Sequence, residues 1–188
     1  MRNLAVLCVA FVYGATGQSD GANTICEGDH PKLASVSIGM SLREVERVLG
    51  RGKLTIRSPD ADAERQYYYI WERSRRRIEV IFTSGKEAVF VGFSSRTKIA
   101  PLGALTLNGS TLVDVVRLLG EPAERVGPAY GEGNYTFYSL VYNCGSKVQV
   151  EFMTDMDCRR PDMNACLSES LLRSRTIHRV ALKKRAAD

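Results

Sequence analysis

The chain has 188 residues, of which 44% are hydrophobic and 25% are charged. This composition is typical of a soluble globular protein with one large or two small domains, and it excludes disordered, collagen-like and multipass membrane proteins. The formal net charge of +5 favours acidic partners weakly, and nucleic acid binding is not indicated because the basic residues are scattered apart from one short run.

The first segment, residues 1–17, has the pattern of a secretory signal peptide. Arg2 precedes an apolar run over residues 4–13, and the small residues Ala15 and Gly17 stand two positions apart before a polar stretch. The alternative is a short core helix, but the run has no capping or amphipathic pattern. We therefore expect a periplasmic or secreted protein, with residues 18–31 as its N-terminal segment.

The cysteines agree with export. Cys8 lies in the apolar run, so Cys26, Cys144, Cys158 and Cys166 remain in the mature chain, an even number that predicts two disulfides. Cys144 and Cys158 would stand at opposite ends of one strand, beyond disulfide reach, so we predict the pairs Cys26–Cys144 and Cys158–Cys166. Lipidation of Cys8 is an alternative to its removal with the leader.

Two segments of the mature chain repeat each other at an offset of 70 residues. Residues 39–50 and 109–120 both predict a short helix with an apolar stripe. Ser41 or Thr111 can cap the first turn, and Gly50 or Gly120 can close the last one.

Three predicted strands follow each helix, with apolar and polar residues alternating along the second strand of the second copy. These strands cover residues 66–71, 78–82 and 88–93 in the first copy, and residues 136–142, 148–152 and 176–182 in the second. We therefore predict the α+β class, with two tandem helix-plus-antiparallel-sheet units. The units are residues 32–95 and residues 102–188, joined by a linker at 96–101, and the second contains a disulfide-closed insertion at 157–175.

The glycine-flanked helices resemble the motif shared by the SmpA/OmlA outer-membrane assembly lipoproteins and the β-lactamase inhibitory proteins. The residues that carry the resemblance are Gly39-Met40-Ser41, Val45, Leu49-Gly50 and Leu119-Gly120-Glu121-Pro122. Tandem duplication is similar to the inhibitory proteins, and this similarity implies a scaffold that binds and inhibits an enzyme. The assembly lipoproteins imply the alternative, an envelope assembly factor.

The residues available for catalysis are few. His30 and His178 lie far apart in the sequence, the cysteines are assigned to disulfides, and no Cys-x-x-Cys pattern indicates a metal site. The glycine-rich stretch 127–134 lacks the lysine of a phosphate loop. We expect no catalytic residues, no metal and no cofactor.

One candidate binding element is aromatic. Tyr67, Tyr69 and Trp71 share one face of their strand, whereas Tyr68 and Ile70 share the other. If the first set lies on the open face of the sheet, it forms an aromatic strip suited to a protein interface; otherwise it is structural. Tyr130, in the glycine-rich stretch, is either part of a flexible turn or a further anchor.

The other candidate is the basic run that connects the first two strands and contains Arg75, Arg76 and Arg77. Such a run is often only a solvated turn. It can also dock an acidic protein surface or anionic lipid headgroups, because neighbouring guanidiniums form bidentate hydrogen bonds with carboxylates and phosphates.

These observations together favour a non-enzymatic, protein-binding module. The preferred hypothesis is an inhibitor or immunity-type protein that caps the active-site cleft of an enzyme with an acidic or aromatic-accepting surface. The alternative is an outer-membrane assembly or maintenance factor, and only that alternative involves a membrane.

Overall fold

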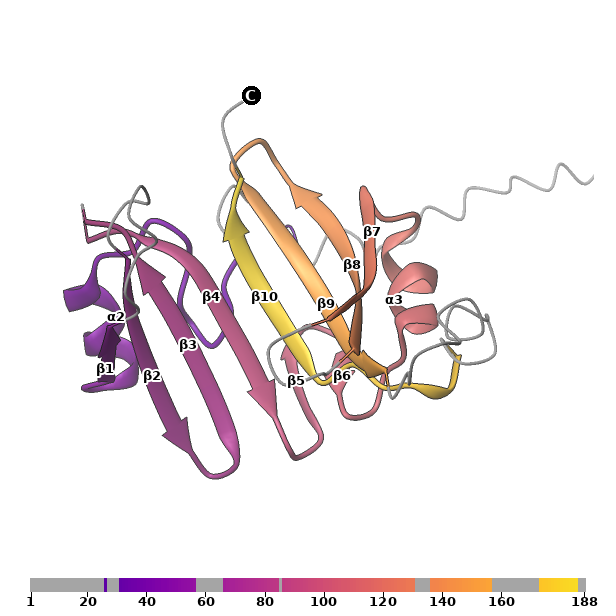
Figure 1. Cartoon of the computed structure of the whole chain (residues 1–188), viewed down its shortest axis with the longest axis horizontal. Coiled ribbons are helices and arrows are strands. Elements are labelled where there is room, and N and C mark those ends of the chain that lie inside the picture. The colour runs from indigo at the N-terminus through magenta and orange to yellow at the C-terminus, as the bar shows by residue number, and fades with distance from the viewer. Residues whose placement is uncertain are drawn as a thin grey trace, which may run out of the picture.

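The computed structural model describes Cys26 and residues 31–56, 66–84, 86–130, 136–156 and 173–185 (Figure 1). These residues include the helices α2 (Leu42–Leu49) and α3 (Leu112–Leu119). The strands in chain order are β1 (Lys53–Ile56), β2 (Tyr67–Arg73), β3 (Arg76–Phe82), β4 (Ala88–Ser95), β5 (Ile99–Leu102), β6 (Leu105–Leu107), β7 (Glu124–Tyr130), β8 (Thr136–Cys144), β9 (Val148–Met156) and β10 (Arg179–Lys184).

The predicted fold class is wrong, because the described chain is mainly β and its strands do not divide into two separate helix-plus-sheet units. Eight strands form one antiparallel sheet in the order β1-β2-β3-β4-β10-β9-β8-β7 (Figure 1). The last strand, β10, pairs with β9 on one side and with β4 on the other, from Arg179↔Ser94 to Lys183↔Phe90. Two separate four-stranded sheets would leave unpaired N–H and C=O groups on the edge strands β4 and β10. The β4·β10 ladder pairs these groups with each other.

Residues 96–101, which we predicted to be a linker, are partly structured. The strand β5 begins at Ile99 and pairs with β6 in a separate two-stranded sheet. Leu102, Leu105 and Leu107 of this small sheet are buried in the core. The segment between the first four strands and α3 therefore contributes to packing rather than only connecting two units.

The helices form where the sequence predicts them, and each begins with a capping box. In α2 the Ser41 hydroxyl accepts a hydrogen bond from the backbone N–H of Glu44, whose carboxylate accepts one from the Ser41 N–H at 2.8 Å. Thr111 and Asp114 make the same reciprocal pair in α3, again with 2.8 Å between the Thr111 nitrogen and the carboxylate. These bonds satisfy donors that a helix N-terminus otherwise leaves free.

One face of the large sheet carries the hydrophobic core. Its apolar side chains belong to the same buried cluster as Val45 of α2 and Val115 of α3. The strand residues that contribute most are Trp71, Val80, Phe82, Val91, Phe93, Leu140, Val150, Phe152 and Leu182. A single core therefore extends beneath both helices and across the β4·β10 junction.

The opposite face of the sheet is polar near that junction. Arg179 of β10 reaches across β4 and donates to Glu79 of β3, with 2.6 Å between the nitrogen and the oxygen. Gly92 makes this contact possible, because a Cβ there would come within 2.9 Å of the Arg179 guanidinium and 2.8 Å of the Phe90 ring. The two halves of the sheet are thus joined by a side-chain ion pair as well as by backbone hydrogen bonds.

A disulfide joins Cys26 to Cys144 at the end of β8, across a sequence separation of 118 residues. It ties the N-terminal segment to the sheet. Cys158 and Cys166, the predicted leader at 1–17 and most of the predicted insertion at 157–175 lie outside the described residues. Among the described helices, none has the length and apolar character needed to cross a bilayer.

Candidate functional site

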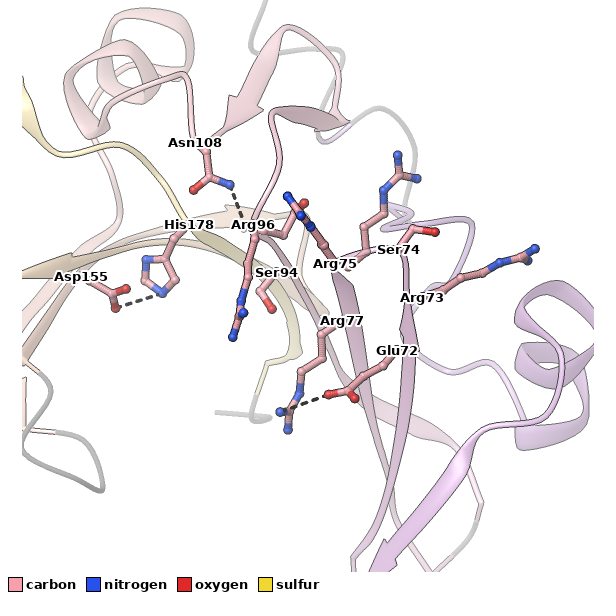
Figure 2. Close-up of a pocket in the computed structure, with 12 residues that line it drawn as sticks. Glu72, Arg73, Ser74, Arg75, Arg77, Ser94, Arg96, Asn108, Asp155 and His178 are labelled. Carbon is pink, nitrogen blue, oxygen red and sulfur yellow. Dashed lines mark hydrogen bonds and ion pairs between the residues drawn. The ribbon is translucent and has the colours of Figure 1, made fainter.

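A cavity of about 840 Å³ lies at one end of the large sheet, where the β2–β3 turn, the end of β4 and the start of β10 meet (Figure 2). We call it the arginine pocket, because its lining includes Arg73, Arg75, Arg76, Arg77 and Arg96. The acidic groups in the lining are Glu72 and Asp155. The pocket therefore carries an excess of positive charge.

The β2–β3 hairpin supplies most of this charge. Arg73 pairs with Arg76 across the last position of the ladder, so Ser74 and Arg75 alone form the turn. Both turn residues have positive φ, 49° for Ser74 and 67° for Arg75, which is the type I′ geometry that matches the twist of a hairpin. Asparagine and glycine are the usual residues in such a turn, so a serine and an arginine occupy it at a conformational cost.

The fifth arginine comes from a different part of the chain. The backbone N–H of Arg96, just beyond β4, donates to the carbonyl of Arg75 at 3.0 Å. Asn108 fixes the segment around Arg96, because its side-chain amide donates to the carbonyls of Ser95 at 2.6 Å and Thr97 at 3.3 Å. Backbone contacts therefore hold the hairpin tip next to Arg96. The guanidiniums of Arg75 and Arg96 take no part in these contacts and can bind a ligand.

The five arginines of the pocket differ in whether they form ion pairs with acidic side chains. Arg77 forms ion pairs with Glu72 at 3.6 Å and with Glu79 at 2.7 Å. Within the described part of the chain, the exposed side chains of the other four arginines in the pocket form no ion pair. Guanidiniums that lack an acidic partner and surround one concavity are suited to binding carboxylates or phosphates.

The remaining side of the pocket contains a histidine and an aspartate. Nε2 of His178 lies 3.2 Å from Oδ1 of Asp155 (Figure 2). Burial lowers the pKa of His178, and nearby Asp155 opposes this effect while Arg179 adds to it. Nδ1 of His178 is buried and has no hydrogen-bond partner among the described residues. Within this part of the chain, the pair therefore has no bonded nucleophile of the kind that a catalytic triad would show.

The aromatic strip is not on the open face, so that hypothesis is wrong. Trp71 is only 8% exposed and belongs to the core, where its indole N–H donates to the carbonyl of Gly50 at 2.9 Å. Tyr67 and Tyr69 are half-buried and pack against the same core. The period-two alternation grouped the side chains correctly, but it could not show which group faces the core.

The structure separates Tyr130 from the arginines. Its backbone belongs to β7, the edge strand on the opposite side of the sheet from β2, where it pairs with Thr136. Its side chain, like residues 131–134 of the glycine-rich stretch, lies outside the described part. Of the predicted binding residues, Arg75, Arg76 and Arg77 line the arginine pocket together.

Sequence reasoning missed Arg96, Asn108, Asp155 and His178 as residues of this site. They lie on segments that are distant in sequence, and the pairing of β4 with β10 brings these segments together. No local pattern could have identified them. Over the described ranges, no group of three or more histidine, cysteine, aspartate or glutamate side chains could hold a metal ion.

Comparison with known proteins supports the architecture alone. Neither a protein-family model nor a curated protein matches the sequence. Among solved structures, the fold is similar to that of a DUF4309 family protein, YjgB, from Bacillus subtilis subsp. subtilis str. 168. The two share 12% sequence identity and a TM-score of 0.50, over 89% of this chain and 97% of that one. This chain therefore shares its fold with a DUF4309 family protein.

Proposed function

We propose that this protein is a non-enzymatic binding protein that docks an acidic surface of another protein in the arginine pocket. One observation carries the proposal: four arginines without an acidic partner among the described residues line a single cavity. Clustered like charges destabilise one another, and an acidic ligand removes that repulsion while it forms bidentate hydrogen bonds.

The shape of the site favours a protein over a membrane as the partner. A concavity of about 840 Å³ can accept a protruding loop with several carboxylates, whereas a lipid surface contacts convex or flat basic faces most readily. Capping the cleft of an enzyme stays a prediction about what the docking achieves.

The proposal places the protein in the periplasm or outside the cell. The N-terminal pattern supports export, as does the disulfide between Cys26 and Cys144, because stable disulfides are rare in reducing compartments. An acidic partner would then be another exported protein or the exposed part of an envelope protein.

The first experiment measures binding of a fluorescent ten-residue polyaspartate peptide to the mature protein at low and high salt. The variant Arg75→Ala with Arg76→Ala removes two arginines that form no ion pair among the described residues, and it should weaken binding by about tenfold or more at low salt. The matched control removes the same charge at the opposite end of the sheet, with Lys147→Ala and Lys184→Ala, both of which are exposed. Screening predicts a change of less than about threefold for this control.

Equal losses in the two double variants would show that net charge, rather than the pocket, attracts the peptide. Binding to vesicles rich in anionic lipid, without binding to the peptide, would assign the arginines to a membrane. If the peptide behaves as expected, a pull-down of periplasmic or secreted proteins followed by mass spectrometry can identify the partner, with the arginine variant as the background control.

A further inference from the structure

A second cavity, of about 420 Å³, lies on the core face of the sheet next to α2. We call it the apolar groove, because Val48, Leu49, Trp71, Ile78 and Phe93 line it. A cavity of about 150 Å³ lined by aliphatic and aromatic side chains is sufficient for benzene. The apolar groove therefore has room for one large apolar side chain.

The groove and the arginine pocket meet at the β2–β3 hairpin. Arg73, Ser74 and Arg76 line both cavities. Arg73 and Arg76 face each other in the ladder, on the same side of the sheet as Trp71 and Ile78. Figure 2 shows Arg73 pointing away from Arg77 and toward helix α2, so the guanidiniums at the hairpin border an apolar surface as well as a charged one.

The floor of the groove is rigid before any ligand binds. The indole of Trp71 is held by its hydrogen bond to Gly50, and Gly52 packs so closely that a Cβ there would lie 2.6 Å from the ring. A ring fixed in this way loses little conformational freedom when a ligand covers it. At the mouth of the groove, Val48 is 47% exposed and offers apolar surface that nothing in the described chain covers.

We propose that the acidic segment of the partner carries one aromatic or large aliphatic side chain, which enters the apolar groove while neighbouring carboxylates bind Arg73 and Arg76. This inference rests on the proposed function, and it adds a specificity element to that function. Charge complementarity selects the occupant, because the guanidiniums at the rim have no acidic partner among the described residues. A purely apolar ligand would not supply one. An apolar anchor in a preformed pocket beside rim charges is the usual arrangement of an interface hot spot.

The test uses two labelled peptides, Asp-Asp-Phe-Asp-Asp and Asp-Asp-Ala-Asp-Asp, with the mature protein. The phenylalanine peptide should bind about tenfold more tightly, because burying the ring adds apolar area at no change in charge. The chain has one tryptophan, so a single indole N–H signal in the NMR spectrum reports on the floor of the groove. That signal should shift with the phenylalanine peptide and not with the alanine peptide.

Two variants make the test specific. Val48→Asp places a negative charge at the mouth of the groove and should abolish the preference for the phenylalanine peptide. Leu54→Asp is the matched control, because Leu54 is similarly exposed, at 45%, and does not line the groove. The control should keep the preference, and both variants should melt near the temperature of the parent protein.

The outcomes separate this inference from the proposed function. Equal, salt-sensitive binding of both peptides without an indole shift would overturn the apolar groove as a subsite and leave the arginine pocket intact. Failure of both peptides, with binding to anionic vesicles, would overturn both proposals. A phenylalanine preference that survives Val48→Asp would place the anchor elsewhere and would also overturn this inference.

Discussion

At the scale of single residues, two aromatic side chains connect the sheet to the helices. The indole N–H of Trp71 donates to Gly50 at the end of α2, and the hydroxyl of Tyr142 donates to Gly120 at the end of α3, at 3.0 Å. Each bond satisfies a carbonyl that the helix leaves without an intrahelical partner. Burial raises the pKa of Tyr142 to about 12, so the hydroxyl stays protonated as a donor throughout the physiological range.

The position of Trp71 predicts that its truncation affects stability first. Trp71→Ala should cost about 3–5 kcal/mol of unfolding free energy, because it leaves a cavity in the core, and Trp71→Phe about 1–3 kcal/mol, mainly through the lost hydrogen bond. Urea titrations followed by circular dichroism measure both. Tyr142→Phe is the matched control for a lost hydrogen bond alone. Unchanged stability of Trp71→Ala would contradict the role of the indole in the core.

Replacing the turn residue Arg75 should raise stability but weaken binding. Its φ of 67° is unfavourable for an arginine and costs glycine nothing, so Arg75→Gly should stabilise the protein by about 0.5–1 kcal/mol and raise Tm by about 1–4 °C. The same variant removes a guanidinium from the arginine pocket and should bind polyaspartate less tightly. Thermal melts and peptide titrations of one sample measure both effects.

Arg76→Gly is the control for this prediction. Arg76 belongs to β3 and is not among the residues with positive φ, so glycine there should lower stability. If Arg75→Gly also lowers Tm, the arginine contributes contacts to the fold that outweigh the strain of its backbone.

At the scale of secondary structure elements, the helices are the features that local sequence determines best. Ser41 with Glu44 and Thr111 with Asp114 are local pairs, and a capping box needs no tertiary contact to form. The backbone N–H of Thr111 lowers the pKa of Asp114, and burial opposes this effect. The Thr111 hydroxyl and Arg117 lower the pKa further. The charged carboxylate is therefore the form that stabilises the folded state.

This pKa predicts how the contribution of the α3 cap depends on pH. Because the folded-state pKa is below the ordinary value of 3.8, the stabilisation is complete above that value and is lost as pH falls through the folded-state pKa. Asp114→Asn should cost about 0.5–1 kcal/mol at pH 7 after solvent screening, and the difference from the parent should vanish at strongly acid pH. Urea titrations at a series of pH values measure this, and a pH-independent difference would contradict it.

The strands show where sequence reasoning succeeds and where it stops. The predicted strands correspond to β2, β3, β4, β8, β9 and β10. Alternation correctly placed Val148, Val150 and Phe152 of β9 in the core. It could not orient β2, because Tyr68 and Ile70 on one side are as apolar as the aromatic residues on the other. β7 was not predicted as a strand because Gly127 and Pro128 interrupt its pattern, although the ladder to β8 tolerates a register shift there.

The candidate site was predictable only in its local part. The arginine run can be recognised in the sequence, because Arg75, Arg76 and Arg77 follow one another along the chain. The hairpin then places all three at the pocket. Arg96 and His178 join them through the β4·β10 ladder, a contact between segments far apart in the sequence. Pairing at that range depends on which sheet edges meet, and residue patterns within each half do not encode it.

At the scale of the whole molecule, continuity of the sheet changes what a core mutation should do. Val45 and Val115 have no exposed surface and lie under different helices, yet both belong to one hydrophobic cluster. Arg179 and Glu79 add a side-chain contact across the middle of the sheet. We therefore expect the two halves of the sheet to unfold together. Disrupting the packing of one helix should not unfold only the half of the sheet that it covers.

Val115→Asp tests this coupling. A buried, unpaired carboxylate costs several kcal/mol, so the variant should unfold at a much lower temperature than the parent, and Val45→Asp should do the same. Trp71, the one tryptophan, lies in β2, in the half of the sheet that does not contain α3. Its fluorescence and the far-UV circular dichroism should nevertheless change in one coincident transition, as a two-state domain requires.

Val48→Asp, exposed on α2, is the control with near-normal stability. If Val115→Asp melts part of the circular dichroism signal while Trp71 fluorescence keeps the transition temperature of the parent, the β4·β10 junction does not couple the halves.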